Sequence, residues 1–279
     1  MATDPGNARI LHLERDHEGA VIVSEQNGIV SLSFGNTAAQ TAIDTTAPDR
    51  LVFGYFPAML AGLMACPRPA RVLCLGLGGG ALVRFLLERL PDVMIDAVEP
   101  RPLVTRLAHE FLMLPRSRRL FVHHMSGYAF LQKKPACYNV ILVDIFDAHG
   151  MAAELFLPEF ASLLRRRLHA GGSAALNLWN SDKKKFQAAK KLAQNTFGPI
   201  ATLSIPARSN VVLLGFRPPY LSLSTLLANA ATLESELQLA GFKQFFWQCC
   251  IKNPLFLLKW MLMRYSLKYR DTQDACRRI

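Results

Sequence analysis

The chain has 279 residues, of which 51% are hydrophobic, and this is enough to bury the core of a large α/β domain with a smaller appendage. The net charge of +11 comes from lysines and arginines scattered over several predicted helices, so we interpret them as solvated faces and do not expect nucleic acid as a partner. The longest apolar run, residues 255–263, is too short to cross a bilayer, and six cysteines without a C-x-x-C pair favour a cytoplasmic protein with no transmembrane segment.

The predicted elements begin with two β-rich runs around Asn27-Gly28, a dipeptide typical of tight turns, which indicate a small N-terminal β-hairpin element. An apolar stretch at 51–65 predicts a helix. Buried strands are then expected at 71–76, 93–99, 120–124, 138–144 and 172–179, with an edge hairpin from 201–205 and 211–216. Because helical patterns separate most of these strands, the chain is predicted to form an α/β fold with a doubly wound, mostly parallel sheet.

These patterns divide the chain into three expected parts. A β-rich N-terminal element covers residues 1–50, a nucleoside-binding Rossmann-like domain covers 51–219, and a helical C-terminal extension covers 220–279. Within the extension, the apolar and basic segment 253–270 could dock on a partner or a membrane surface, but we favour a role in covering the sheet.

A glycine-rich stretch, LGLGGGAL, connects the first predicted strand of the sheet to the helix after it. Glycines allow a sharp turn and a close approach to a ligand, and the helix N-terminus offers free N–H groups. The candidate ligand-binding residues in this loop are Gly76, Gly78, Gly79 and Gly80. Glu99, at the end of the next strand, is placed to accept both hydroxyls of a ribose. The loop lacks a P-loop motif, fits a dinucleotide fingerprint only loosely, and suits an adenosyl-sulfonium cofactor at least as well.

Two acids, Asp144 and Asp147, follow the predicted strand at 138–144. Transfer of a group to an amine needs a neutral nitrogen, so a carboxylate must hold the incoming ammonium and take its proton. The same acids could instead cap the following turn or bond loop N–H groups. Asn177 and Trp179, at the end of a later strand, either line an acceptor pocket or belong to the core, and His149 is interpreted as an ordinary loop histidine.

The stretch from Val72 to Trp179 resembles the spermidine/spermine synthase (polyamine aminopropyltransferase) family. The family signature D-S-S-D-P-x-G-P-A-x-x-L-F is matched by DIFDAHGMAAELF, residues 144–156, at both acids, the glycine, the second alanine and the final Leu-Phe. YNVILVD likewise matches the family's Y-D-V-I-x-x-D, and Ser126-Gly127 stand where the family has Asp-Gly.

This resemblance implies a methyltransferase-like Rossmann fold with seven strands, a small-molecule amine substrate and no metal. It implies a cofactor that is decarboxylated S-adenosylmethionine or S-adenosylmethionine. The cofactor contacts would come from Gln40, Gly76, Gly78, Gly79, Gly80, Glu99, Ser126, Gly127 and Asp144. It also suggests Asp144 as the catalytic base and Asp147 as an anchor for the amine. Whether the chain forms a homodimer is left open.

Several family positions that hold the polyamine or the cofactor are changed. The loop acid is Gly79, the Tyr-Gln pair is Phe53-Gly54, the late acceptor-site Tyr is Ala207 or Arg208, and the acid that partners the adenine is Ser126. Loss of the loop acid should weaken discrimination in favour of the decarboxylated cofactor. The leading hypothesis is therefore an aminopropyltransferase-like enzyme. One alternative is an S-adenosylmethionine-dependent methyltransferase, and another is a non-catalytic relative that binds a nucleoside or a partner.

Overall fold

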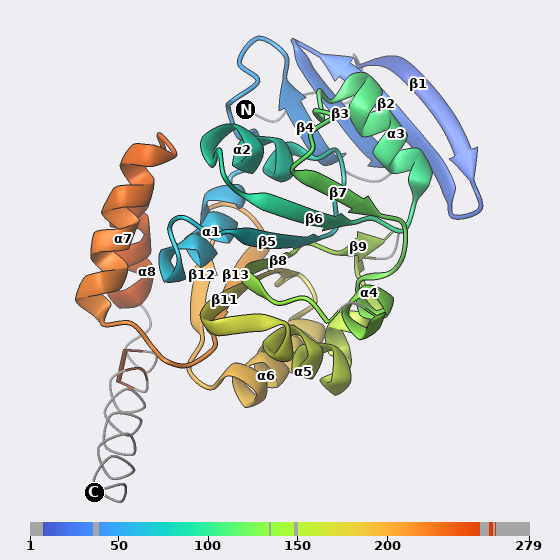
Figure 1. The fold of residues 1–279 in the computed structure, drawn as a ribbon. Coiled ribbons are helices and arrows are strands. Elements are labelled where there is room, and N and C mark those ends of the chain that lie inside the picture. The colour runs from blue at the N-terminus through green and yellow to red at the C-terminus, as the bar shows by residue number, and fades with distance from the viewer. Residues whose placement is uncertain are drawn as a thin grey trace, which may run out of the picture.

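A computed structural model of the chain describes residues 8–35, 39–133, 135–147, 150–251, 257, 258 and 260. Its centre is a seven-stranded sheet with the order β12-β13-β11-β8-β5-β6-β7 (Figure 1). The strands are β5 (Arg71–Leu75), β6 (Met94–Val98), β7 (Leu120–His123), β8 (Tyr138–Val143), β11 (Leu168–Trp179), β12 (Ala201–Ser204) and β13 (Asn210–Phe216). The pairs β7/β6, β6/β5, β5/β8 and β8/β11 are parallel, while β13 runs antiparallel to both of its neighbours.

The central strands are apolar along their whole length because helices cover both faces of the sheet. Successive strand residues point to opposite faces, so Leu73 and Ile141 enter one core while Cys74 and Leu142 enter the other. The first core includes residues of α4 (Gly127–Lys133), α5 (Pro158–Arg166) and α6 (Lys183–Phe197). The second includes residues of α2 (Ala81–Arg89), α7 (Leu223–Glu236) and α8 (Phe242–Ile251). The predicted doubly wound α/β fold is thereby confirmed.

The N-terminal part is larger than the predicted hairpin. Asn27 and Gly28 both adopt positive φ in the expected tight turn, but the strands on either side gain one further neighbour each. The result is a four-stranded antiparallel sheet of β1 (Arg9–Asp16), β2 (Gly19–Gln26), β3 (Ile29–Phe34) and β4 (Ala39–Asp44). It packs through Val21, Val23 and Leu32 against α3 (Pro102–Phe111), and β4 delivers Gln40 and Thr41 to the edge of the main cavity.

The helix predicted over 51–65 is shorter than expected. It consists of α1 (Phe56–Leu60) followed by one 3₁₀ turn, η2 (Ala61–Ala65). Pro57 lies at the start of α1, where its missing N–H and fixed φ are tolerated, and residues 51–55 form an irregular lead-in. Gly62 lies against Val140 of β8, and this close crossing places the lead-in, including Tyr55, over the strand ends.

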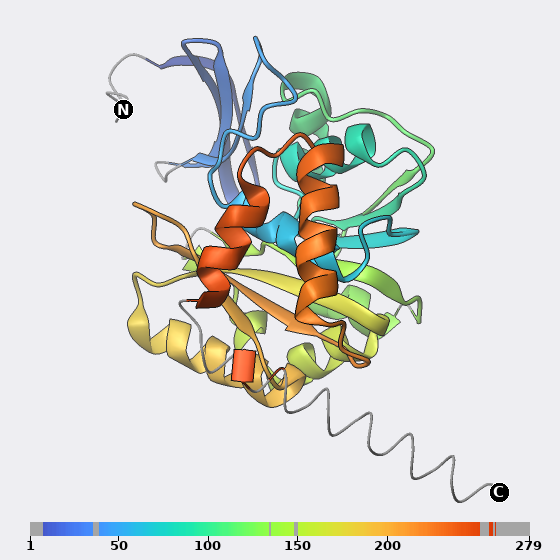
Figure 2. The same ribbon diagram turned by 90° about the vertical axis from the view of Figure 1, so that its left-hand side faces the viewer.

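The helices of the C-terminal extension cover one face of the sheet, as Figure 2 shows for α7 and α8. Leu226, Leu233 and Phe246 enter the core there, and the Trp260 indole N–H donates to the Leu221 carbonyl at 3.0 Å. Most of the segment 253–270 lies outside the described residues, so its predicted role stays a prediction, as does the division of the chain into three parts. Within the part of the chain that the structure describes, no helix is long and apolar enough to cross a membrane.

Candidate active site

A cavity of about 750 Å³ opens at the carboxyl ends of the parallel strands. It lies where the strand order reverses, because the chain passes from β5 to β6 on one side and later returns to β8 on the other. Ligands of doubly wound folds bind at such a reversal. One end, which we call the glycine end, is formed by Gly76, Gly78, Glu99 and Ser126. The other, the aromatic end, is formed by Phe53, Tyr55, Phe146 and Trp179.

The glycine loop is divided between the cavity and the core. Gly76 and Gly78 line the cavity with positive φ, and a Cβ at Gly76 would collide with the backbone oxygen of Asp144. Gly79 and Gly80 are buried and are not among the residues that line the cavity. A Cβ at Gly80 would meet Leu114 Cδ1 at 2.5 Å. The loop therefore offers two of its four candidate glycines to a ligand.

The position of the missing loop acid is filled by packing. A Cβ built on Gly79 would lie 2.6 Å from Leu112 Cδ2 and would also collide with the Thr41 side chain. An aspartate there would have room only if the buried side chains of Thr41 and Leu112 moved aside. Loss of the acid is therefore built into the packing around the loop.

Glu99 is held by backbone donors at the glycine end. It is 6% exposed, and its carboxylate accepts the N–H of Gly78 at 3.3 Å and of Arg101 at 3.1 Å. Burial raises the pKa of Glu99 to about 7, and these N–H groups limit the rise. Two further donors on a bound ribose would favour its charged form.

A second carboxylate at this end was not identified in the sequence. Ser126, in the family's acid position, is exposed and caps α4 by accepting the Ala129 N–H at 3.1 Å. Beside it, Glu154 of η3 (Ala153–Phe156) accepts the Tyr128 N–H at 3.2 Å and lies against Gly127. Burial raises the pKa of Glu154. Its only sequence signal is a variable position inside the 144–156 signature.

Asp144 stands between the two ends and is fixed by side-chain donors. The Tyr55 hydroxyl donates to Oδ2 at 2.9 Å, and the Asn177 amide donates to Oδ1 at 2.8 Å. Asn210 donates in turn to the Asn177 carbonyl oxygen at 3.0 Å. Burial raises the pKa of Asp144, and the two donors act against that rise. The carboxylate is thus oriented, and its raised pKa makes it a stronger proton acceptor than an ordinary aspartate.

Tyr55 was missed because the sequence comparison assigned the family's Tyr-Gln pair to Phe53-Gly54. The hydroxyl that reaches Asp144 comes from the residue after that pair. Burial and the adjacent Asp144 carboxylate raise the pKa of Tyr55 well above its ordinary value, so the phenol stays protonated and donates. Asn177 was identified as a pocket candidate, and its contact with Asp144 gives it a definite structural role.

Asp147 lies at the exposed rim of the cavity on a short hairpin. This hairpin pairs β9 (Phe146–Asp147) with β10 (Gly150–Met151). The Phe146 and Trp179 rings pack with centroids 4.8 Å apart, and the backbone N–H of Trp179 donates to Met151 Sδ at 3.2 Å. Ala148 and His149 lie outside the described residues. Gln40, on β4, also lines the cavity.

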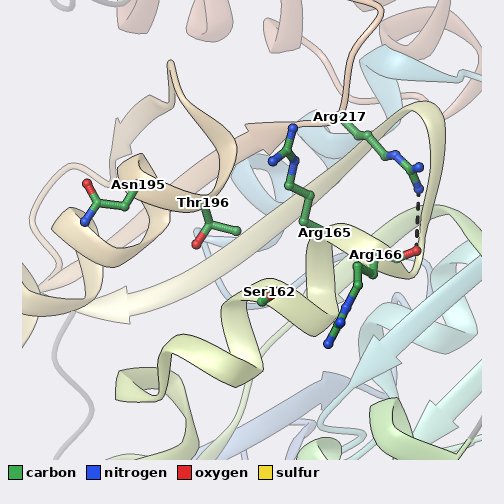
Figure 3. Close-up of a pocket in the computed structure, with 6 residues that line it drawn as sticks. All are labelled: Ser162, Arg165, Arg166, Asn195, Thr196 and Arg217. Carbon is green, nitrogen blue, oxygen red and sulfur yellow. Dashed lines mark hydrogen bonds between the residues drawn. The ribbon is translucent and has the colours of Figure 1, made fainter.

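A second hollow is lined by three arginines and differs chemically from the main cavity. It measures about 420 Å³ and lies between α5, α6 and the residue after β13 (Figure 3). Its lining residues are Ser162, Arg165, Arg166, Asn195, Thr196 and Arg217, and one Arg217 nitrogen donates to the Arg166 carbonyl. It contains guanidinium groups and no carboxylate, so it lacks a base for proton transfer. Among the described residues, no group of three or more His, Cys, Asp or Glu side chains could hold a metal ion.

Comparison with known proteins identifies the family. The chain matches the spermine/spermidine synthase domain over residues 58–208. It is 31% identical over 198 residues to the polyamine aminopropyltransferase of Chromobacterium violaceum, covering 71% of this chain and 76% of that protein. A probable spermidine synthase from Corynebacterium glutamicum has a TM-score of 0.68 at 20% identity, over 80% of this chain and 86% of the other. Human methyltransferase-like protein 13, in complex with SAH, has a TM-score of 0.61 at 24% identity, over 67% and 93%.

The two solved structures confirm the expected methyltransferase-like Rossmann fold, because both superpose on most of this chain. The domain match extends over more than half of the 279 residues. The predicted aminopropyltransferase-like enzyme class agrees with the name of the Chromobacterium relative and is confirmed at the level of the family. The chain therefore belongs to the spermine/spermidine synthase family, in which it is a divergent member.

Proposed function

We propose that the protein is an aminopropyltransferase that uses decarboxylated S-adenosylmethionine and a small-molecule amine. The observation that carries this proposal is the position of Asp144, which is fixed by Tyr55 and Asn177 and whose backbone oxygen lies against Gly76. A proton acceptor and a ligand-binding loop thus share one cavity. A carboxylate oriented by two donors is suited to a reaction that starts from an ammonium ion.

The glycine end fits the nucleoside of such a cofactor. The cavity volume of about 750 Å³ lies within the range of about 300–1,000 Å³ that is typical of small-molecule sites. Gly76 and Gly78 let a ligand approach the backbone, and Glu99 offers a buried acceptor for ribose hydroxyls. Ser126, Gly127 and Glu154 line the same end and are suited to contact the base.

When bound, the sulfonium cofactor would supply a carbon activated for attack by a nitrogen lone pair. Asp144 would hold the incoming ammonium and take its proton as attack proceeds, while Tyr55 and Asn177 keep the carboxylate oriented. Asp147, at the rim, is proposed as the anchor that guides the amine inward. Because burial raises the pKa of Asp144, its carboxylate is protonated at a higher pH than that of an ordinary aspartate, and activity should rise with pH through that pKa.

An S-adenosylmethionine-dependent methyltransferase is the second candidate, and one observation favours it. Gly79 replaces the acid that would select an amine-bearing tail over one with a carboxylate, and the side chains of Thr41 and Leu112 fill its place. The human methyltransferase-like protein in complex with SAH shares this fold. A shared fold does not determine the reaction, however, and the match to curated aminopropyltransferases favours the first candidate.

The two reactions release different nucleosides, so one experiment separates them. The protein is incubated with an amine mixture and either decarboxylated S-adenosylmethionine or S-adenosylmethionine, and the products are resolved by chromatography. Methylthioadenosine formed from the decarboxylated cofactor supports aminopropyl transfer, whereas S-adenosylhomocysteine formed from the other supports methyl transfer. Absence of both products, together with no calorimetric binding of either cofactor or of methylthioadenosine, would overturn the enzymatic proposal in favour of a non-catalytic relative.

A further inference from the structure

We propose that the amine acceptor is a primary monoamine with an apolar, preferably aromatic, body and not a diamine. This inference rests on the proposed transferase function and concerns the aromatic end of the cavity. In the transfer, the amine lone pair forms the new C–N bond and the C–S electron pair stays with sulfur as a neutral thioether. The surplus proton leaves through Asp144 to solvent. The cofactor would occupy the glycine end. The rest of the acceptor would therefore lie on the other side of Asp144, next to the ends of β11 and β13.

Aromatic rings dominate that region. Phe146 and Trp179 pack at 4.8 Å between centroids, and both line the cavity. Phe53 and Tyr55 line it as well, with stacked rings 5.9 Å apart. These two pairs come from segments more than 90 residues apart in the sequence, yet they border the same space. Such rings stabilise an apolar or aromatic body by burying its surface, at about 25 cal/mol per Å².

A diamine needs a second anionic group, and the aromatic end offers no buried one. Of the described residues that line the cavity, five are acids: Glu18, Glu99, Asp144, Asp147 and Glu154. Glu99 and Glu154 are bonded to backbone N–H groups at the glycine end, and Glu18 follows β1 in the N-terminal sheet. Asp144 is the proposed base.

The remaining acid, Asp147, lies at the exposed rim of the cavity. Asp147 lines the cavity next to Phe146, but its side chain is exposed to solvent, which screens its attraction for an ammonium. It can meet an amine at the rim, but it does not belong to the aromatic surface beyond Asp144.

The charged group at this end is a cation, Arg208. It lines the cavity from the loop between β12 and β13, and this loop is tied to the end of β11 by the bond from the Asn180 N–H to the Ser209 carbonyl at 2.8 Å. The Arg208 side chain is exposed, and among the described residues its guanidinium has no ion pair or side-chain hydrogen bond, so only solvent screens its charge. A second ammonium placed here would meet a like charge, whereas an apolar body would not.

The test compares amines with one and two charges in the full-length protein. Initial rates of methylthioadenosine release are measured with 2-phenylethylamine, butylamine and 1,4-diaminobutane. The wild-type protein should give a kcat/KM for 2-phenylethylamine about tenfold or more above that for the diamine. Arg208→Glu should raise the ratio of diamine to 2-phenylethylamine by about tenfold, and Arg208→Lys, which keeps the charge, should leave it unchanged. Arg165→Ala, in the hollow of Figure 3, is a surface control that should match the wild type.

Trp179 provides an independent arm. Trp179→Ala should reduce kcat/KM for 2-phenylethylamine several-fold more than for butylamine, and Trp179→Phe should restore most of the difference. A wild-type preference for the diamine that Arg208→Glu does not alter would overturn the acceptor class and leave the transferase intact. Methylthioadenosine could bind although no amine turns over. In that case the affinities of the same amines for the protein with bound methylthioadenosine are measured by calorimetry. 2-Phenylethylamine must bind more tightly than 1,4-diaminobutane, and any other order overturns the inference. Failure of methylthioadenosine to bind would instead refute the proposed function itself.

Discussion

The two ends of the cavity are built in different ways. At the glycine end, the carboxylates of Glu99 and Glu154 are held by backbone N–H groups, and two glycines expose the main chain. At the aromatic end, side chains alone form the surface, and Arg208 lies there without a partner among the described residues. A backbone-built site changes little when side chains are substituted, whereas a site built of side chains changes with each substitution. Nucleoside recognition should therefore tolerate sequence divergence, and acceptor choice should not.

The largest expected effect comes from substituting Asp144, which lies between the two ends. Asp144→Asn keeps the size and the hydrogen-bonding shape of the side chain but removes the proton acceptor. Turnover should fall by about a hundredfold or more, the usual contribution of a general base. Calorimetric affinity for methylthioadenosine should stay within a factor of about two, since the glycine end is untouched. Retained turnover would remove Asp144 from its assigned role and leave the glycine end as the only functional half.

The next largest effect is expected at Gly76, where the glycine loop contacts the backbone of Asp144. Gly76→Ala adds a Cβ that collides with the Asp144 backbone oxygen, at a residue whose φ is +89°. Both nucleoside affinity and turnover should fall by about tenfold or more, and the free energy of unfolding should drop by about 2 kcal/mol or more. Gly241→Ala is the matched control, because Gly241 has φ of +77° with no atom near its Cβ position. If both variants lose the same stability and neither loses affinity, backbone strain alone explains the cost.

At the glycine end, Glu99 should make the stability of the fold depend on pH and should contribute to nucleoside binding. The pKa of about 7 lies above the ordinary 4.5, so the folded protein binds more protons than the unfolded chain between these values. The Glu99 contribution to the free energy of unfolding therefore falls by up to about 3 kcal/mol as pH rises through this window. Glu99→Gln should remove this dependence on pH. The measurement is the Tm of variant and wild type from pH 5 to 8, in which the wild type should lose stability relative to the variant as pH rises. The substitution should also lower methylthioadenosine affinity by about tenfold near pH 8.

The smallest effect should come from Tyr55, which supports Asp144 from the aromatic end. Tyr55→Phe removes a donor that lowers the Asp144 pKa, so the acid limb of the pH–rate profile should move to higher pH. Turnover at pH 8 should fall by only about threefold to tenfold, the equivalent of one lost hydrogen bond. Tyr220→Phe, which removes a buried hydroxyl contact to the Phe197 carbonyl, is the matched control and should leave the profile unshifted.

The fold and the glycine end could be predicted because their signals are local. Near-continuous apolar runs such as β5 and β8 indicate strands covered on both faces, and Gly76, Gly78, Glu99 and Asp144 follow directly from the ends of such strands. Two of the four predicted loop glycines, Gly79 and Gly80, turn into the core instead, because their neighbours come from Thr41, Leu112 and Leu114. A sequence pattern does not indicate which segments will pack against a loop.

The aromatic end was harder to predict because it is assembled from distant segments. Tyr55 belongs to an apolar stretch that indicates a helix, and only the crossing of η2 over the sheet brings its hydroxyl to Asp144. Trp179 and Phe146 each read equally well as core residues, and their contact depends on the β9–β10 hairpin. The sequence shows that Ala207 or Arg208 replaces the family's acceptor-site Tyr. The position of Arg208 on the cavity wall depends on the β12–β13 loop, which is held by the hydrogen bond from the Asn180 N–H to the Ser209 carbonyl.

The contact between Gly76 and the Asp144 main chain has an evolutionary consequence. Because no side chain fits between them, the spacing of the two strand ends is fixed to within an atom's width. A lineage that changes its acceptor can remodel the β12–β13 loop or the rings around it. It cannot shift Asp144 relative to the glycine loop without first rebuilding both strands. If these are the proposed base and cofactor loop, new specificities should arise at the periphery while the geometry of the reacting atoms is inherited.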